Sequence, residues 1–221
     1  VISPPRSHAS EFALSRVHWL AVSLFVLTLL VYGRTLAPSI TWQNAGADSG
    51  DLVAAIYTGG IPHPPGYPLY TLLTQIFLLL PVGSVAYRVN LFSAFSASLA
   101  VAVLFLIMRG LLSDRAGRNV TAIAAALLFA FSPLFWSQAT IAEVNAFHVL
   151  LAALLLGGLI EWSRALENQS NKRVQVFQWI ITILLAILSI DFRRLQRGAE
   201  ERYRERLIQI ERLTTLGQLS G

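Results

Sequence analysis

Two aspartates, a histidine and a tyrosine occur within about twenty positions of one another in a chain with few acidic residues. Asp48 and Asp51 are three positions apart, and the proline-rich segment from Ile61 to Pro68 contains His63 and Tyr67. Carboxylates and imidazoles transfer protons, so this spacing favours general acid–base chemistry. An alternative is structural: Asp48 accepts an N–H group from the first turn of a helix, and Asp51 interacts with the helix dipole.

Two further charged residues stand at the ends of apolar runs. Glu143 precedes a run that begins at Val144, where a carboxylate either interacts with a helix N-terminus or contacts a substrate. Arg88 precedes a run that begins at Val89, where a guanidinium either extends to lipid headgroups or holds a phosphate group. We take Asp48 and Asp51 as candidate catalytic residues. The candidate substrate-binding residues are His63, Tyr67, Arg88 and Glu143.

The composition places these residues in a membrane protein. Of 221 residues, 55% are hydrophobic and 13% are charged, whereas about 25% are charged in soluble domains. A mean hydropathy of +0.59 excludes an ordinary water-soluble enzyme and a disordered chain. In a membrane protein, a net charge of +5 is explained first by the orientation of the spans and by contact with anionic lipid headgroups, and only second by binding of nucleic acid. The chain has no cysteine, so a thiol nucleophile and a disulfide framework are excluded.

Five apolar runs approach the roughly 20 residues that span a bilayer. They cover residues 17–33, 89–108, 120–136, 144–162 and 174–190. The first four give a helical bundle whose basic loops all face the cytoplasm, as the positive-inside rule requires. The fifth conflicts with that rule, because an arginine-rich segment follows it. Either it is a hairpin or interfacial helix, or the last fifty or so residues do not share the architecture of the rest, which we favour.

A shorter apolar stretch, Leu69 to Val82, is not predicted to cross the membrane. If it did, the basic loops would fall on opposite sides, so we expect a juxtamembrane helix in the interface. A short helix from Leu52 to Thr58, ended by Gly59 and Gly60, is expected before it. Residues 38–88 then form an outward loop that carries both aspartates.

Several strings occur in a fixed order along this part of the chain. They are TLAPSIT at 35–41, DSGD at 48–51, GIPHPPGYPL at 60–69, AYRVNL at 86–91, FSPLFWSQAT at 131–140 and AEV at 142–144. Together they resemble the DUF2723 family of protein O-mannosyltransferase-like membrane proteins, of the GT-C glycosyltransferase class. The resemblance covers about residues 17–163.

The resemblance implies a GT-C-like bundle of about four to five transmembrane helices, with an extracytoplasmic juxtamembrane loop over a lipid-facing cavity. It also implies sugar transfer from a polyprenyl-phosphate donor to a hydroxyl acceptor on a protein or glycan. An acidic loop residue is then the general base, and Arg88 is a partner for the leaving phosphate. Asp48 matches the loop aspartate of the family, whereas Asp51 stands where glutamate is more usual and Asn145 where an aromatic is usual. No residue is predicted as a metal ligand. The sequence leaves open whether the protein uses a cofactor such as a divalent metal.

The C-terminal tail has a different pattern. Apolar residues in 192–219 recur near the 3.5-residue repeat of a coiled coil, which predicts an amphipathic helix that forms a homodimer. The string ERLTTLGQLSG at 211–221 resembles the linker before the phosphoacceptor of sensor histidine kinases. No histidine follows His148, so kinase activity is excluded. The arginines alternate with glutamates, so nucleic acid is not expected as a partner.

The sequence therefore predicts an all-α integral membrane protein with four regions. These are a cytoplasmic N-terminus (1–16), a partial GT-C-like membrane domain (17–167), a linker with an extra hydrophobic helix (168–190) and the amphipathic tail (191–221). The leading hypothesis is a fragment of a membrane glycosyltransferase, in the plasma membrane of a bacterium or the endoplasmic reticulum of a eukaryote. The alternative is a non-catalytic membrane sensor or anchor, a segment of a truncated histidine kinase-like protein.

Overall fold

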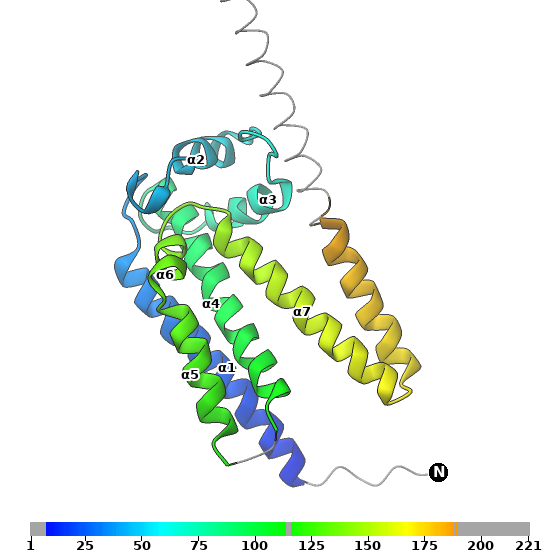
Figure 1. The fold of residues 1–221 in the computed structure, drawn as a ribbon. Helices are drawn as coiled ribbons and strands as arrows, with labels where there is room; N and C mark the ends of the chain where they lie inside the picture. The colour runs from blue at the N-terminus through cyan, green and yellow to red at the C-terminus, as the bar shows by residue number, and fades with distance from the viewer. Residues whose placement is uncertain (1–7, 114–115, 188, 190–221) are drawn as a thin grey trace, which may run out of the picture.

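The described part of the structure, a computed structural model, covers residues 8–113, 116–187 and 189, and within it there are helices and no strands. Figure 1 shows the arrangement of the helices. They are α1 (His8–Thr35), α2 (Ser49–Thr58), α3 (Pro68–Phe77), α4 (Val85–Leu111), α5 (Arg118–Ala130), α6 (Pro133–Ala139) and α7 (Asn145–Glu167), with a short 3-10 turn at Gln43–Ala45. Residues 171–187 form a further helix. The predicted all-α fold class is confirmed.

Three of these helices are long and apolar enough to cross a membrane, namely α1 from Arg16, α4 and α7. Helices α5 and α6 make a fourth candidate if the two, bent by 67°, form one span. These segments correspond to the first four predicted runs. The fifth run is helical at 171–187, and this helix returns alongside α7 toward the end of the molecule where α2 and α3 lie (Figure 1).

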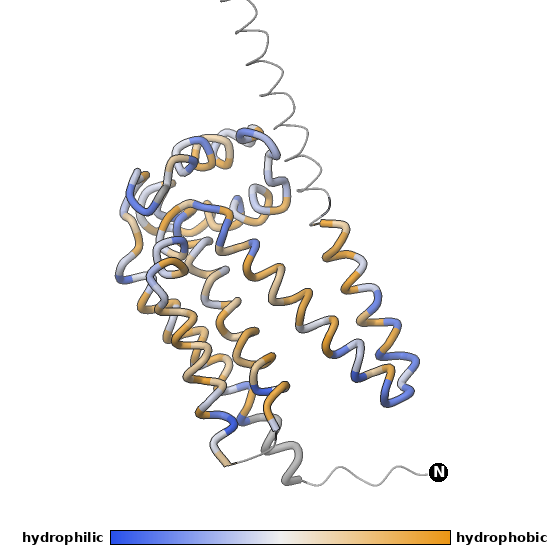
Figure 2. Tube along the Cα trace, viewed as in Figure 1, coloured by the Kyte–Doolittle hydropathy of each residue, from blue (hydrophilic) through white to orange (hydrophobic). Residues whose placement is uncertain are grey.

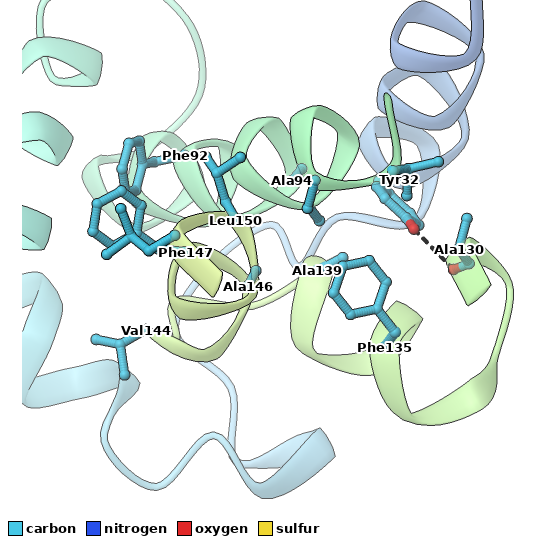
Figure 3. Packing of buried hydrophobic residues seen from close by; sticks show 14 of the residues in the cluster. Tyr32, Phe92, Ala94, Ala130, Phe135, Ala139, Val144, Ala146, Phe147 and Leu150 are labelled. Atoms are coloured by element: carbon cyan, nitrogen blue, oxygen red, sulfur yellow. Dashed lines mark hydrogen bonds between the residues drawn. The ribbon is translucent and has the colours of Figure 1, made fainter. Parts of the chain in front are cut away.

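Helix α4 is the centre of the bundle and packs against α1, α5 and α7. In the most apolar 18-residue stretch of α4, 61% is buried inside the protein, whereas 28% is buried in the corresponding stretches of α1 and α7. Small buried residues along α4, such as Ala94, Ala97 and Ala100, allow its neighbours to approach closely. Figure 3 shows Phe92 of α4 beside Phe147 of α7, whose ring centroids are 5.5 Å apart.

The third predicted run is broken where a single span was expected. Pro133 begins α6 and cannot donate a backbone hydrogen bond, so the helix that ends at Ala130 does not continue. The Tyr32 hydroxyl of α1 donates a hydrogen bond of 2.8 Å to the Ala130 carbonyl, which the break leaves without a helical partner (Figure 3). A side chain from another helix thus satisfies the polar backbone at the bend.

Helices α2 and α3 lie across one end of the bundle, and Figure 2 shows polar residues concentrated there and at the opposite ends of the long helices. Helix α3 is shorter than the stretch Leu69 to Val82 that we expected to be helical, because it ends at Phe77 and turns follow. Ser84 then starts α4 by accepting a hydrogen bond of 3.1 Å from the Tyr87 N–H group. The position of α3 in a membrane interface stays a prediction.

Candidate functional site

Helix α2 carries both aspartates at its start. It begins at Ser49 and ends at Gly59, whose φ of 68° lies in the left-handed region that glycine adopts without strain. Asp48 occupies the N-cap position, but its side chain accepts no hydrogen bond from the first turn, so the capping alternative for Asp48 is wrong. Its backbone already has helical angles (φ −87°, ψ −9°), unlike the extended N-cap residues whose side chains reach back to the turn. Asp51 lies in the first turn, as predicted.

The segment between α2 and α3 places a histidine between the two carboxylates. One carboxylate oxygen of Asp51, Oδ2, accepts a hydrogen bond of 2.7 Å from the His63 backbone N–H group and lies 2.7 Å from the ring atom Nδ1. The other ring nitrogen, Nε2, is 3.4 Å from Oδ2 of Asp48. The His63 side chain is 27% exposed, so the ring faces both carboxylates and remains accessible to solvent.

Asp51 favours its ionised form. Partial burial raises the pKa of its carboxyl group, but the hydrogen bonds from the backbone and ring of His63 and the charge of that ring outweigh the burial, so the net pKa is lowered. Asp51 therefore stays an acceptor for His63 and fixes the ring orientation.

Tyr67 connects the histidine to the helical bundle. Its ring lies edge-on to His63, with centroids 5.6 Å apart, and its centroid is 6.0 Å from that of His148 on α7. Pro68 follows Tyr67 directly and begins α3 with the fixed φ that suits a first helical position. The segment from Ile61 to Tyr67 carries no helix, as its prolines predicted, and its rigidity stays a prediction.

Glu143 lies in the segment between α6 and α7, and it is only 5% exposed. Burial, and next the negative charge of Asp48, raise the pKa of its carboxyl group to about 7, although His63 and the N–H groups of Asp48 and Val144 lower it. Within the described residues its Oε1 atom is buried and has no hydrogen-bond partner. Its backbone carbonyl accepts a hydrogen bond of 3.2 Å from the Ser93 hydroxyl of α4.

Two residues of this interior region were not recognised in the sequence. The Tyr70 hydroxyl of α3 lies near Ser93 and Glu143, and within the described residues it has no partner of normal hydrogen-bond geometry. Ser49 donates a hydrogen bond of 3.0 Å to the Ala142 carbonyl and so ties the start of α2 to the segment that carries Glu143. Neither has a sequence signal, since a buried serine or tyrosine on a helix has no characteristic pattern.

Arg88 lies apart from this group. Its guanidinium donates to the carbonyl oxygens of Leu78 (2.7 Å), Val82 (2.9 Å) and Gly83 (3.3 Å), which follow the end of α3. The described hydrogen bonds and ion pairs link it to none of the clustered acidic residues. The structure thus brings together Asp48, Asp51, His63, Tyr67 and Glu143 and leaves Arg88 at the corner between α3 and α4.

A metal site was not predicted, and the described residues contain no group of three or more histidine and acidic side chains placed to hold a metal ion. The clustered side chains instead contact one another. The arrangement is suited to proton transfer through an accessible carboxylate whose neighbours are held in place.

Comparison with known proteins gives the family. The sequence model described as the N-terminal domain of protein O-mannosyl-transferase TMEM260 matches residues 48–192, which include the whole group from Asp48 to Glu143. The chain belongs to this family. The match continues through the helix at 171–187, whereas the resemblance that we described from the sequence ends near residue 163.

Two TMEM260 relatives agree with this assignment. A mouse (Mus musculus) protein O-mannosyl-transferase TMEM260 is 36% identical over 155 residues, which are 70% of this chain and 21% of the relative. A Dictyostelium discoideum protein of the same name is 29% identical over 161 residues, which are 72% of this chain and 19% of the relative. The chain therefore spans about a fifth of the length of these relatives. No solved structure matches it significantly.

The family match confirms the O-mannosyltransferase-like part of the resemblance described from the sequence. It does not confirm the DUF2723 name. The kinase-like alternative is not favoured, because the family match covers residues 48–192 and so includes the hydrophobic helix that this alternative assigned to a sensor. The predicted coiled coil, the homodimer and the kinase-linker string at 211–221 lie outside the described residues, and they stay predictions.

Proposed function

We propose that this chain forms the acceptor-activating part of a membrane glycosyltransferase that moves a sugar, mannose in the first instance, from a polyprenyl-phosphate donor to a hydroxyl group. The observation that carries the proposal is the His63 ring held between Asp48 and Asp51, inside the segment that matches the TMEM260 family. The names of the relatives support the type of reaction. The geometry supports the choice of residues.

Asp48 is the general base in this proposal. Its side chain is 55% exposed, and its only ion-pair contact in the described residues is the longer one to His63, so it remains open to an acceptor. The acceptor oxygen forms a bond to the anomeric carbon as the bond from that carbon to the phosphate oxygen breaks. The hydroxyl proton moves to Asp48, and the polyprenyl phosphate leaves with the bonding electron pair, which gives inversion.

Asp51 and His63 are positioning residues. Asp51 holds His63 by two contacts to one oxygen, and His63 in turn faces the Asp48 carboxylate. With a proton on each ring nitrogen, His63 donates to Asp51 through Nδ1 and to Asp48 through Nε2, and it so orients the Asp48 carboxylate.

The distribution of charge supports placement of this site outside the cytoplasm. Four arginines lie toward the ends of α1, α4, α5 and α7 that are remote from α2 and α3 (Figure 1), namely Arg16, Arg109, Arg118 and Arg164, against Arg34 and Arg88 at the opposite ends of α1 and α4. Basic residues mark the cytoplasmic ends of spans, so the site faces the opposite side, where a lipid-linked sugar would be used.

The test is a transfer assay on membranes that contain the product of the intact gene, with polyprenyl-phosphate mannose as donor and a set of serine- and threonine-containing peptides as acceptors. We expect Asp48→Asn to lower kcat about 100-fold or more, because removal of a general base costs roughly 10²–10⁴-fold.

Glu161→Gln is the matched control, because Glu161 is an acid paired with Arg164 near the other end of the bundle. We expect it to stay within about twofold of the unmodified protein. Full activity of Asp48→Asn, or no transfer from any polyprenyl-phosphate sugar by the unmodified protein, contradicts the proposal.

A further inference from the structure

A crevice lies between α4, α7 and the helix at 171–187, at the end of the bundle remote from Asp48. It has a volume of about 320 Å³, and its walls are mainly aliphatic. Leu106, Leu154 and Ile180, one from each helix, line it and are between 38% and 40% exposed. The crevice is therefore open at its side, where a membrane-spanning bundle meets lipid chains.

A second hollow continues the crevice toward the turn that joins α7 to the next helix. It has a volume of about 350 Å³ and shares Glu161 and Phe177 with the first. Lys172 and Arg173 also line it. Figure 2 shows that both helices change from mainly apolar residues along their length to polar residues at the turn that joins them. An apolar space thus leads directly to a basic one.

The basic residues of the second hollow are not neutralised. The single acid of the two hollows, Glu161, pairs with Arg164, whose other nitrogen Nη2 donates a hydrogen bond of 2.6 Å to the Gly110 carbonyl. Within the described part of the chain, Lys172 and Arg173 form no ion pair, and both are exposed. Two positive charges therefore remain at the mouth of an apolar crevice.

We propose that this crevice and its basic mouth bind an anionic phospholipid, with an acyl chain between α4, α7 and the helix at 171–187 and the phosphate at Lys172 and Arg173. Basic pockets between transmembrane helices bind anionic headgroups. Each hollow falls within the range of about 300–1,000 Å³ usual for ligand sites. The site is separate from Asp48 and does not depend on the proposed glycosyl transfer.

The test measures lipid preference in the purified full chain, reconstituted in phosphatidylcholine nanodiscs. Phosphatidylglycerol is titrated against phosphatidylcholine, and native mass spectrometry of the released protein counts the lipid molecules of each kind that stay bound. We expect a preference for phosphatidylglycerol of about fivefold for each basic residue, or roughly 25-fold in all. The double variant Lys172→Gln, Arg173→Gln is expected to lose that preference.

Two further variants separate this site from general surface charge. Arg16→Gln with Arg118→Gln removes the same charge from helices that do not line the crevice, and we expect the preference to persist. Gly157→Leu fills the crevice without a change of charge; a Cβ atom at Gly157 lies 3.5 Å from Ile107, an ordinary contact, so the fold is expected to tolerate it. This variant is expected to weaken binding of both lipids about equally.

The proposal is overturned if the two double variants lose the preference equally, since diffuse charge then explains it. It also fails if the unmodified chain binds both lipids equally. A Gly157→Leu variant that changes only the oligomeric state, with lipid preference retained, would assign the crevice to a second copy of the chain.

Discussion

At the scale of single residues, the accessible part of the site follows from the sequence and the buried part does not. Asp48, Asp51 and His63 are close along the chain, and the prolines around His63 fix its segment, so their proximity is predictable from local geometry. Glu143 comes beside them only through the packing of α7 and α4, and Tyr70 through that of α3. No local pattern encodes such contacts.

The dependence of His63 on Asp51 gives a first prediction at this scale. Asp51→Asn leaves one carbonyl oxygen for two contacts and removes the charge that attracts the ring, so we expect transfer to fall about 10- to 100-fold. Asp51→Glu keeps a carboxylate acceptor and is expected to restore most of the activity. Equal losses in the two variants, measured with the same donor and acceptor, would argue against a positioning role for the carboxylate.

Glu143 gives a second prediction, on stability. Its pKa of about 7 in the folded protein lies above the ordinary value of 4.5 for a glutamate, so the folded state binds the proton more tightly than the unfolded state does. Its contribution is therefore fully present below about pH 4.5 and is lost as the pH rises toward 7, by up to about 3 kcal/mol.

Thermal unfolding in detergent between pH 5 and pH 8 measures this effect. The unmodified chain is expected to lose stability across this window through Glu143, and Glu143→Gln, which stays neutral, is expected to show a smaller loss. Identical slopes for both proteins would mean that Glu143 does not titrate in this range.

At the scale of elements, the end of α2 and the start of α3 were predictable, whereas the end of α3 and the bend after α5 were not. Gly59 and Pro68 are strong local signals for the end of one helix and the start of the next. Hydropathy is uninterrupted through residues 120–136, so it concealed the break at Pro133. The break is stabilised by Tyr32, whose hydroxyl comes from a helix about a hundred residues earlier.

Arg88 gives a prediction for the corner between α3 and α4. Because its guanidinium satisfies three carbonyls, we expect Arg88→Gln to lower the free energy of unfolding by about 1–3 kcal/mol. Arg88→Lys should recover little, since one ammonium group does not reproduce the planar fork. Thermal unfolding gives this result, and the donor KM provides the contrast: a raised KM with unchanged stability would support a phosphate-binding role instead.

At the scale of the whole molecule, the first four apolar runs predicted the bundle, and the positive-inside rule failed to place the fifth. The helix at 171–187 returns beside α7 and lies within the family match. At about 1.5 Å per residue its 17 described positions extend roughly 25 Å, slightly less than a hydrocarbon core of about 30 Å. Charge counting opposes a fifth crossing because it weighs the arginines after residue 190, and whether this helix crosses stays a prediction.

The absence of cysteine allows a direct test of this topology. Single substitutions Thr58→Cys, Ala116→Cys, Gln169→Cys and Ser189→Cys introduce one thiol each into a chain that has none. With an impermeant thiol reagent on sealed vesicles, we expect the thiols introduced at Ala116 and Gln169 to react from one side, and those introduced at Thr58 and Ser189 to react from the other. If the thiol introduced at Ser189 reacts on the same side as the one at Gln169, the helix at 171–187 does not cross.

The hydrogen bond from Ser49 to Ala142 can form only late in the synthesis of the chain. Its partners are 93 residues apart, and a ribosome that adds about 5–20 residues per second needs roughly 5–20 s to pass from one to the other. For that time α2 is already translated, while the segment that holds it has not been made. Asp48 and His63 must therefore await the last third of the described chain before their support exists.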